Sequence, residues 1–481
     1  MTASLLILAA TFAAAIALGL LARRGHTMDL EQWSVGGRSF GTIFVFLLMA
    51  GEIYTTFTFL GGSGWAYGKG APALYILCYG AVAYTISYFI LPVVWRYARA
   101  NGLVSQADFF VAKYRSPALG VLVALVSVAA LVPYLVLQLK GLGIIVSEAS
   151  YGRVSSTAAV WVGSAALVVY VVASGVRGSA WTAALKDLLI LSVAVVIGIY
   201  LPVHYYGGYH AMFAAINAAH PGFLTLPASG MSVSWFISTV LLTSVGFYMW
   251  PQFFAASYTA KHENVFRKNA VLLPLYQLVI LFVFFAGFAA ILQVPGLKGA
   301  NADLSLLRVA EHTFSPTWVG VIGAAGLLTA LVPGSMILLT AATILAQNVY
   351  RVAVPTATDR AVSLLARRLV PVIALACVAL TLRGGEAIVP LLLMGYNLVT
   401  QLFPALLLSL GEQPLVSTAG AAAGIVAGEL SVAYLSFTGA SVSTLAPWAP
   451  QMIKDLNVGL VALAVNVVVL TLVAVTTRKS P

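Results

Sequence analysis

The stretch MAGEIYTTFTFLGGSGWAYGKG, residues 49–70, decides the fold of this chain. It extends the apolar run before it, and a run of about 20 apolar residues is long enough to cross a membrane as a helix. Yet it contains a carboxylate, Glu52, and three glycines, Gly61, Gly62 and Gly64, which weaken a helix. A charge and helix-weakening residues inside one span predict an interrupted helix rather than a continuous one.

The composition of the whole chain is that of an integral membrane protein. Of its 481 residues, 61% are hydrophobic and 8% are charged, whereas about a quarter of the residues of a soluble protein carry a charge. The apolar runs are too long and too uniform for the strands of a barrel, so an all-α polytopic fold is expected. Thirteen transmembrane helices are predicted, at residues 3–22, 40–67, 72–95, 117–147, 156–176, 187–204, 231–259, 269–293, 316–349, 369–383, 387–410, 414–437 and 456–477.

The net charge of +11 is distributed unevenly between the loops. If the N-terminus lies outside, 18 of the 25 Lys and Arg residues fall on the cytoplasmic side, six fall outside and one, Lys140, lies within a span. This asymmetry is the positive-inside rule, and it predicts an external N-terminus and a cytoplasmic C-terminus. The basic residues therefore indicate orientation in a lipid membrane. They imply no nucleic-acid partner, and no protein partner is evident.

A second interrupted span is predicted at residues 244–260, SVGFYMWPQFFAASYTA, where Gly246 and Pro251 weaken the helix. The two interrupted spans are five spans apart, so a second unit of five would run through the membrane inverted relative to the first. Paired interruptions in two inverted halves indicate a secondary transporter with its site near the membrane midplane. The predicted organisation is a single transmembrane domain, 1–481, divided into an N-terminal extra helix and loop at 1–35, a first repeat at 40–204, a second repeat at 231–411 and two accessory helices at 412–481.

Few ionisable residues are predicted inside the membrane, and each is therefore a functional candidate. Glu52 lies at the first interruption, and a carboxylate that can be protonated within the membrane is what proton coupling requires. Lys140 has three interpretations: pairing with Glu52, attraction of a carboxylate substrate, or extension to the outer headgroups. Glu429 lies outside both repeats and is expected to be structural or lipid-facing. Lys186 and Asp187 are expected to form a local pair at the membrane interface.

These runs resemble the sodium:solute symporter family over about residues 34–410. The resemblance is carried, in order, by GGRSFG (36–41), FLGGSGWAYGKG (59–70), GVRGSAWTAALKDLLIL (175–191), MWPQFFAASYTAKHENVFRKNA (249–270), ATILAQNVYR (342–351) and YNLVTQLFPALLLSLG (396–411). Within the family the chain is most similar to bacterial monocarboxylate permeases, through GEIYTTFTF (51–59), VPYLVLQLKG (132–141), LKD (185–187) and ALVPGSMILLTAATILAQNVYR (330–351). The resemblance implies a LeuT-type inverted five-helix repeat, a bacterial inner-membrane location and substrates such as lactate, pyruvate, acetate or propionate.

The resemblance also implies where a coupling ion would bind. Sodium-coupled members hold the ion between carbonyls of the interrupted second span and a pair of hydroxyls on the ninth. The matching positions here are Gly51 and Tyr54 for the carbonyls, Thr329 for a third ligand, and Val332 and Pro333 for the hydroxyl pair. Val332 and Pro333 carry no hydroxyl, and a hard cation prefers several oxygen ligands, so the sodium site is in doubt unless Thr329 or Ser335 substitutes. The coupling ion expected is therefore H+ through Glu52, with Na+ as the alternative.

The substrate-lining positions of the family fall on Thr55, Thr56, Tyr134, Gln138, Trp250, Gln252 and Tyr396, with Lys140 as a further group for a carboxylate. The function predicted is import of short monocarboxylates by proton-coupled symport and alternating access. The alternatives are a sodium-coupled symporter of another small solute, such as an amino acid or pantothenate, and a transporter-like sensor. No cofactor is predicted, and the absence of a nucleophile motif, an acid–base cluster and a phosphate loop argues against an enzyme.

Overall fold

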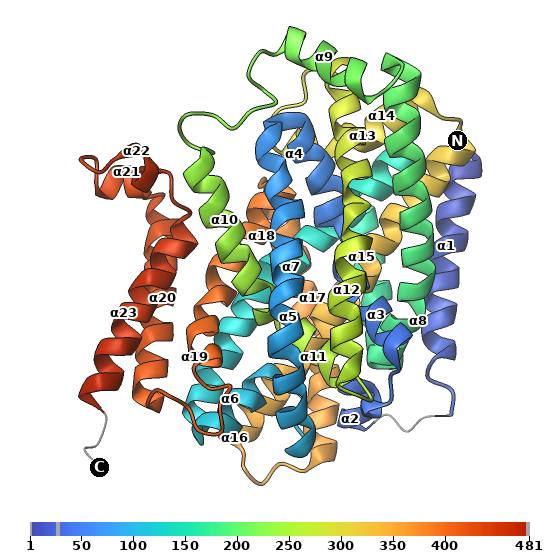
Figure 1. Cartoon of the computed structure of the whole chain (residues 1–481). Helices are drawn as coiled ribbons and strands as arrows, with labels where there is room; N and C mark the ends of the chain where they lie inside the picture. The colour runs from blue at the N-terminus through green and yellow to red at the C-terminus, as the bar shows by residue number, and fades with distance from the viewer. Residues whose placement is uncertain (1, 26–28, 478–481) are drawn as a thin grey trace.

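The computed structural model describes residues 2–25 and 29–477. In that part of the chain the regular structure is helical, apart from a two-residue parallel bridge between Phe40 and Ala260. The long helices run side by side along one direction, which is the arrangement of a membrane bundle (Figure 1). The predicted all-α polytopic fold is confirmed.

The first half of the described chain contains α1 (Thr2–Leu21), α2 (Leu30–Val35), α3 (Thr42–Gly51), η2 (Phe57–Gly61), α4 (Gly62–Lys69), α5 (Tyr75–Ala100), α6 (Gln106–Tyr114), α7 (Pro117–Ala149), α8 (Ser156–Tyr206) and α9 (Tyr209–Ala219). The second half contains α10 (Val233–Gly246), η4 (Phe247–Met249), α11 (Pro251–Tyr258), α12 (Asn264–Leu278), α13 (Ile280–Gln293), η5 (Gly299–Leu304), α14 (Ser305–Thr313), α15 (Pro316–Ile344), η6 (Leu345–Tyr350), α16 (Arg351–Ala353), α17 (Asp359–Arg383), α18 (Ile388–Val399), α19 (Phe403–Leu407), α20 (Thr418–Thr438), α21 (Val442–Leu445), α22 (Gln451–Lys454) and α23 (Val458–Thr476).

Ten helices in the described residues are long and apolar enough to cross a membrane, or eleven when the bent pair α10–α11 is counted as one span. The prediction of thirteen exceeds this number for two reasons. The predicted fifth and sixth spans both lie in α8, whose 51 residues are divided at Gly175 by a non-helical backbone (φ 55°, ψ −149°). The predicted second span is divided into α3, η2 and α4, and none of these three elements is long enough to cross a membrane alone.

Both predicted interruptions are present. The α3 helix ends at Gly51, and residues 52–55 form a turn before helical structure resumes and η2 begins. In the second half, Trp250 adopts an extended backbone (φ −63°, ψ 126°), Pro251 starts α11, and the helix bends by 46°. Proline fits the first turn of a helix because it has no N–H to donate there. The boundaries of the two repeats, 40–204 and 231–411, remain a prediction.

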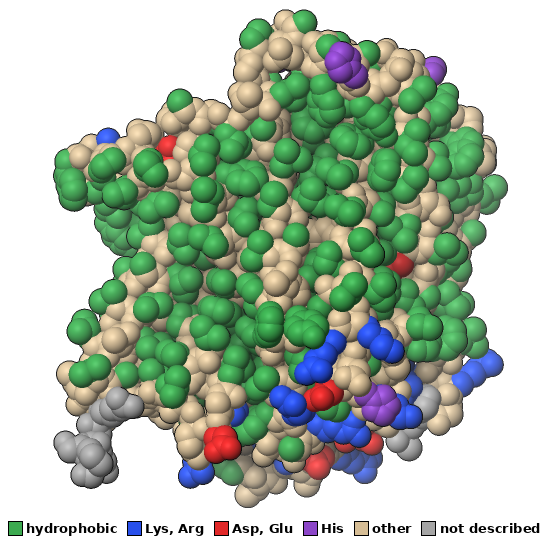
Figure 2. All heavy atoms as spheres, in the orientation of Figure 1, with side chains coloured by type: hydrophobic (Ala, Val, Ile, Leu, Met, Phe, Trp, Pro, Cys, Tyr) green, Lys and Arg blue, Asp and Glu red, His purple; other side chains and the backbone are tan. Residues whose placement is uncertain are grey.

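Basic side chains gather at one end of the molecule, where α2, α6 and α16 lie (Figures 1 and 2). We call this the basic end and the other the opposite end. At the basic end, Arg99 donates a hydrogen bond to the carbonyl of Lys261, and Arg96 pairs with Glu263 at 3.4 Å. The basic end is the predicted cytoplasmic side, and orientation remains a prediction. Two basic residues of that prediction, Arg478 and Lys479, lie outside the described residues.

Candidate functional site

The two helix breaks face one enclosed cavity in the middle of the bundle. The first break contributes Glu52, Ile53, Phe57 and Thr58, and the second contributes Phe247, Trp250 and Phe253. Other helices supply the remaining walls, Ile76, Tyr79, Tyr84, Tyr134, Gln277, Ile280, Leu392 and Tyr396. The free volume is about 10 Å³, which holds about one water molecule. The structure therefore closes the cavity around its own side chains.

Glu52 and Gln252 are the buried polar groups that distinguish this region. Glu52 follows the last residue of α3 and is 3% exposed, and Gln252 in the first turn of α11 is fully buried. In the described part of the chain, neither the Glu52 carboxyl nor the Gln252 amide forms a hydrogen bond of normal geometry, although the two side chains lie close enough to interact with each other. An unsatisfied buried polar group costs about 1–3 kcal/mol, so these two side chains are candidates for contact with a ligand or a proton.

Three predicted substrate residues form an aromatic wall of the cavity. The ring of Trp250 lies 4.8 Å from that of Tyr134 and 5.3 Å from that of Tyr396, measured between centroids. Tyr79, which was not predicted, extends the wall through a T-shaped contact with Tyr396 at 5.8 Å. The indole N–H of Trp250 forms no hydrogen bond of normal geometry among the described residues and lies near the Tyr396 hydroxyl.

The predicted residues Thr55, Thr56 and Gln138 lie behind the cavity wall and shape the first break. The Thr55 hydroxyl accepts a hydrogen bond from the N–H of Phe57 at 3.1 Å, which stabilises the turn. The Thr56 hydroxyl donates to the side-chain oxygen of Gln138 at 2.8 Å and thereby joins the break to α7. These three side chains position the break rather than line the cavity.

Lys140 does not join this group. Its ammonium donates a hydrogen bond to the carbonyl of Glu386, between α17 and α18, and interacts electrostatically with Asp303. Burial raises the pKa of Asp303 to about 6, although its carboxyl accepts a hydrogen bond from the N–H of Ile388 at 3.0 Å. The pairing of Lys140 with Glu52 considered from the sequence is therefore not what the structure shows. Lys140 belongs to a polar cluster nearer the opposite end.

Lys186 and Asp187 were expected to form a local pair at the membrane interface; the pair is confirmed, but it is buried inside the bundle rather than at an exposed end. Lys186 is fully buried in α8 and donates hydrogen bonds to the carbonyls of Gly51 at 2.8 Å and Tyr54 at 3.1 Å. Its ammonium also forms an ion pair with Asp187 at 2.9 Å, and the Tyr276 hydroxyl donates to the same carboxylate oxygen at 2.8 Å. The sequence carried a usable signal, because the buried polar residues Ser179, Thr182 and Lys186 fall on one face of a helix at spacings of three and four.

The residues at the predicted ion site do not fit a sodium ion. The Val332 side chain lies 3.6 Å from the point where a Cβ on Gly51 would stand, so an apolar group occupies that side of the break. Thr329 donates its hydroxyl to the carbonyl of Gly326 in its own helix at 2.6 Å. Ser335 bonds the Val332 carbonyl at 2.6 Å and the Ser179 hydroxyl at 2.7 Å. The two carbonyls that remain already accept hydrogen bonds from Lys186.

The arrangement defines a class of protein: an all-helical secondary transporter with two broken helices around one closed central site. The chain belongs to the sodium:solute symporter family, whose model matches residues 33–428. It is therefore a secondary active symporter in a membrane and not an enzyme. This confirms the family that the sequence motifs predicted.

Two relatives and one solved structure illustrate how far the similarity extends. The chain is 61% identical over 480 residues to the uncharacterized symporter YhjB of Bacillus subtilis (strain 168), covering 100% of this chain and 98% of the relative. It is 27% identical over 474 residues to a monocarboxylate transport permease protein of Rhizobium johnstonii, covering 95% and 93%. Its fold is similar to the outward-open state of a Na+-coupled sialic acid symporter, with a TM-score of 0.76 and 16% identity over 100% and 99% of the two chains.

Proposed function

We propose that this protein imports short-chain monocarboxylates, of the lactate, pyruvate, acetate and propionate class, together with protons across a bacterial inner membrane. The observation that carries the proposal is the buried carboxyl of Glu52 in the closed cavity at the first helix break. The 27% identical relative named as a monocarboxylate transport permease supports the substrate class.

The chemistry of the cavity links the proton to the anion. A protonated Glu52 carboxyl can donate a hydrogen bond to a substrate carboxylate, whereas the ionised form repels it. The indole N–H of Trp250 is a further donor in the cavity wall, whereas the Gln252 amide is not among the residues that line the cavity and lies next to Glu52. The rings of Tyr134 and Tyr396 limit the size of the apolar tail. Binding of the anion then requires a proton on Glu52, which couples the two fluxes when the cavity opens alternately to each side.

The test is uptake of radiolabelled lactate and pyruvate into proteoliposomes under imposed gradients. We expect an inward proton gradient to drive accumulation and a sodium gradient to have no effect. Glu52→Gln, which mimics the protonated acid, should abolish accumulation driven by the proton gradient but retain exchange of labelled for unlabelled substrate. Glu429→Gln is the matched control, because Glu429 is a partly buried carboxyl in α20 that has an unpartnered oxygen and lies outside the cavity.

Sodium-dependent uptake would contradict the proposal and favour a different function. Uptake that needs sodium, with Glu52→Gln behaving like the parent, would replace this proposal with a sodium-coupled symporter of another small solute, such as an amino acid or pantothenate. The family name and the sodium-coupled sialic acid symporter of similar fold are the observations behind that alternative. If the protein binds a solute but transports none of the solutes tested, it would instead be a sensor.

A further inference from the structure

The first helix break leaves buried backbone carbonyls that need a hydrogen-bond donor or a cation. Where α3 stops at Gly51, the regular hydrogen-bond ladder of the helix stops too, and the last carbonyls of a helix carry partial negative charge. Burying them without a donor or a cation would cost free energy, since no water reaches a membrane interior to satisfy them. The carbonyls of Gly51 and Tyr54 are satisfied by the Lys186 ammonium, at 2.8 and 3.1 Å.

The ammonium of Lys186 has the surroundings of a bound ion. Three oxygens surround it within 3.1 Å: the two carbonyls and the Asp187 carboxylate at 2.9 Å. The side chain is fully buried, and the Tyr276 hydroxyl holds the carboxylate from the neighbouring helix α12. Glu52 is the other acid that interacts electrostatically with Lys186. The Lys186 ammonium is a compact cation that cannot dissociate, because it is part of a side chain.

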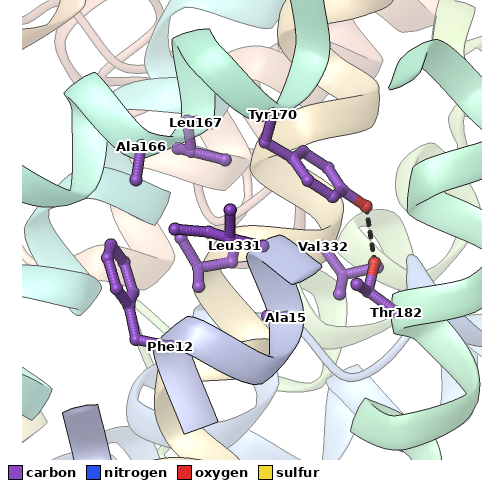
Figure 3. A pocket seen from close by; sticks show the side chains of 9 residues that line it. Phe12, Ala15, Ala166, Leu167, Tyr170, Thr182, Leu331 and Val332 are labelled. Atoms are coloured by element: carbon purple, nitrogen blue, oxygen red, sulfur yellow. Dashed lines mark hydrogen bonds between the residues drawn. The ribbon is translucent and has the colours of Figure 1, made fainter. Parts of the chain in front are cut away.

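Among the described residues, the side chain of α15 that lies within 4 Å of a Cβ on Gly51 is apolar. Val332 of α15 faces Gly51, and Figure 3 shows the Val332 side chain close to a small pocket whose other walls are mainly the apolar side chains of α1, α8 and α15. The polar pair in that view, the Tyr170 hydroxyl and the Thr182 hydroxyl, bond each other at 2.6 Å. A sodium ion would therefore have to displace the ammonium and still lack the ligands that a hard cation prefers.

We infer that Lys186 is the resident cation of the helix break and occupies the place that a sodium ion takes in sodium-coupled relatives, so that this symporter does not bind sodium there. The inference rests on the helix break itself and uses the proposed function only for the choice of coupling ion. It can be tested without any substrate. Its failure is therefore distinguishable from the failure of the monocarboxylate proposal.

The experiment measures 22Na+ binding by the purified protein in detergent, with choline chloride keeping the ionic strength constant. We expect no saturable binding by the parent and measurable, saturable binding by Lys186→Ala, because that variant leaves two carbonyls and the Asp187 carboxylate around a free space. Adding Val332→Ser to Lys186→Ala should tighten binding several-fold by supplying one more oxygen. The matched control is Lys113→Met, which removes another largely buried lysine that donates to a backbone carbonyl, that of Gly411 at 2.6 Å.

Equal 22Na+ binding by the parent and by Lys186→Ala, whether strong in both or absent from both, would overturn the inference. If Lys186→Ala cannot be purified, 22Na+ binding by Val332→Ser alone still tests whether Lys186 fills the site. That variant retains the ammonium and should bind no more sodium than the parent. Sodium binding created by the added hydroxyl while Lys186 is present would show that the ammonium does not fill the site.

Discussion

The buried pair of Lys186 and Asp187 should behave as one unit in a double-mutant cycle. Lys186→Met keeps most of the side-chain volume but leaves the Asp187 carboxylate buried without its partner, and it leaves the carbonyls of Gly51 and Tyr54 without a donor. Removing one member of a buried ion pair typically costs about 3–5 kcal/mol. Asp187→Asn should cost less, because the amide oxygen can still accept from the Tyr276 hydroxyl.

The double variant Lys186→Met, Asp187→Asn removes both charges together. It should therefore lose less stability than the sum of the two single variants, with a coupling of about 2–3 kcal/mol, as for residues in direct contact. Scanning fluorimetry in detergent should place the Lys186→Met protein at the lowest unfolding temperature and the double variant above it. Strictly additive losses, or no loss in either single variant, would refute the geometry described for the break.

Two further predictions concern stability. Because burial raises the Asp303 pKa from 3.8 to about 6, the folded protein binds that proton more tightly than the unfolded chain and loses up to ~3 kcal/mol of stability as pH rises from about 4 to 6. Asp303→Asn should therefore unfold at a higher temperature than the parent at pH 8 and show a smaller difference at pH 4, whereas an equal difference at both would contradict the raised pKa. Gly175→Ala should lower the unfolding temperature clearly, because φ is 55° and the new Cβ would lie 2.4 Å from the carbonyl oxygen of Trp33. Gly207→Ala is its control, since it also has a positive φ but nothing within 4 Å, and equal losses in the two would show that the close contact with α2 does not matter.

The fold could be predicted from the sequence because membranes impose simple length and composition rules. Helix breaks were also predictable, since Gly51, Glu52 and Pro251 are residues that disturb a helix or resist burial. The two arms of α8 were predicted as separate spans, 156–176 and 187–204, and the first of them ends next to the break at Gly175. The conformation of the break could not be predicted, because it depends on a positive φ and on the close approach of Trp33.

The site was predictable only in part, because depth along a helix decides which side chains meet. Tyr134 and Lys140 lie on the same helix, but six residues along a helix correspond to about 9 Å, so Tyr134 reaches the cavity while Lys140 bonds Glu386 further toward the opposite end. Lys186 was misplaced for a related reason. A lysine near the predicted start of a span suggests a headgroup contact, whereas α8 carries it into the protein interior against Gly51.

The most direct test of the central claim is proton movement in the absence of sodium. Proteoliposomes in sodium-free buffer, with a pH indicator outside, receive unlabelled pyruvate or lactate without any imposed gradient. We expect the external medium to become more alkaline with the parent and with Glu429→Gln, whereas Glu52→Gln should change it no more than protein-free liposomes do. Substrate entry that needs added sodium and moves no protons through the parent would contradict proton-coupled symport.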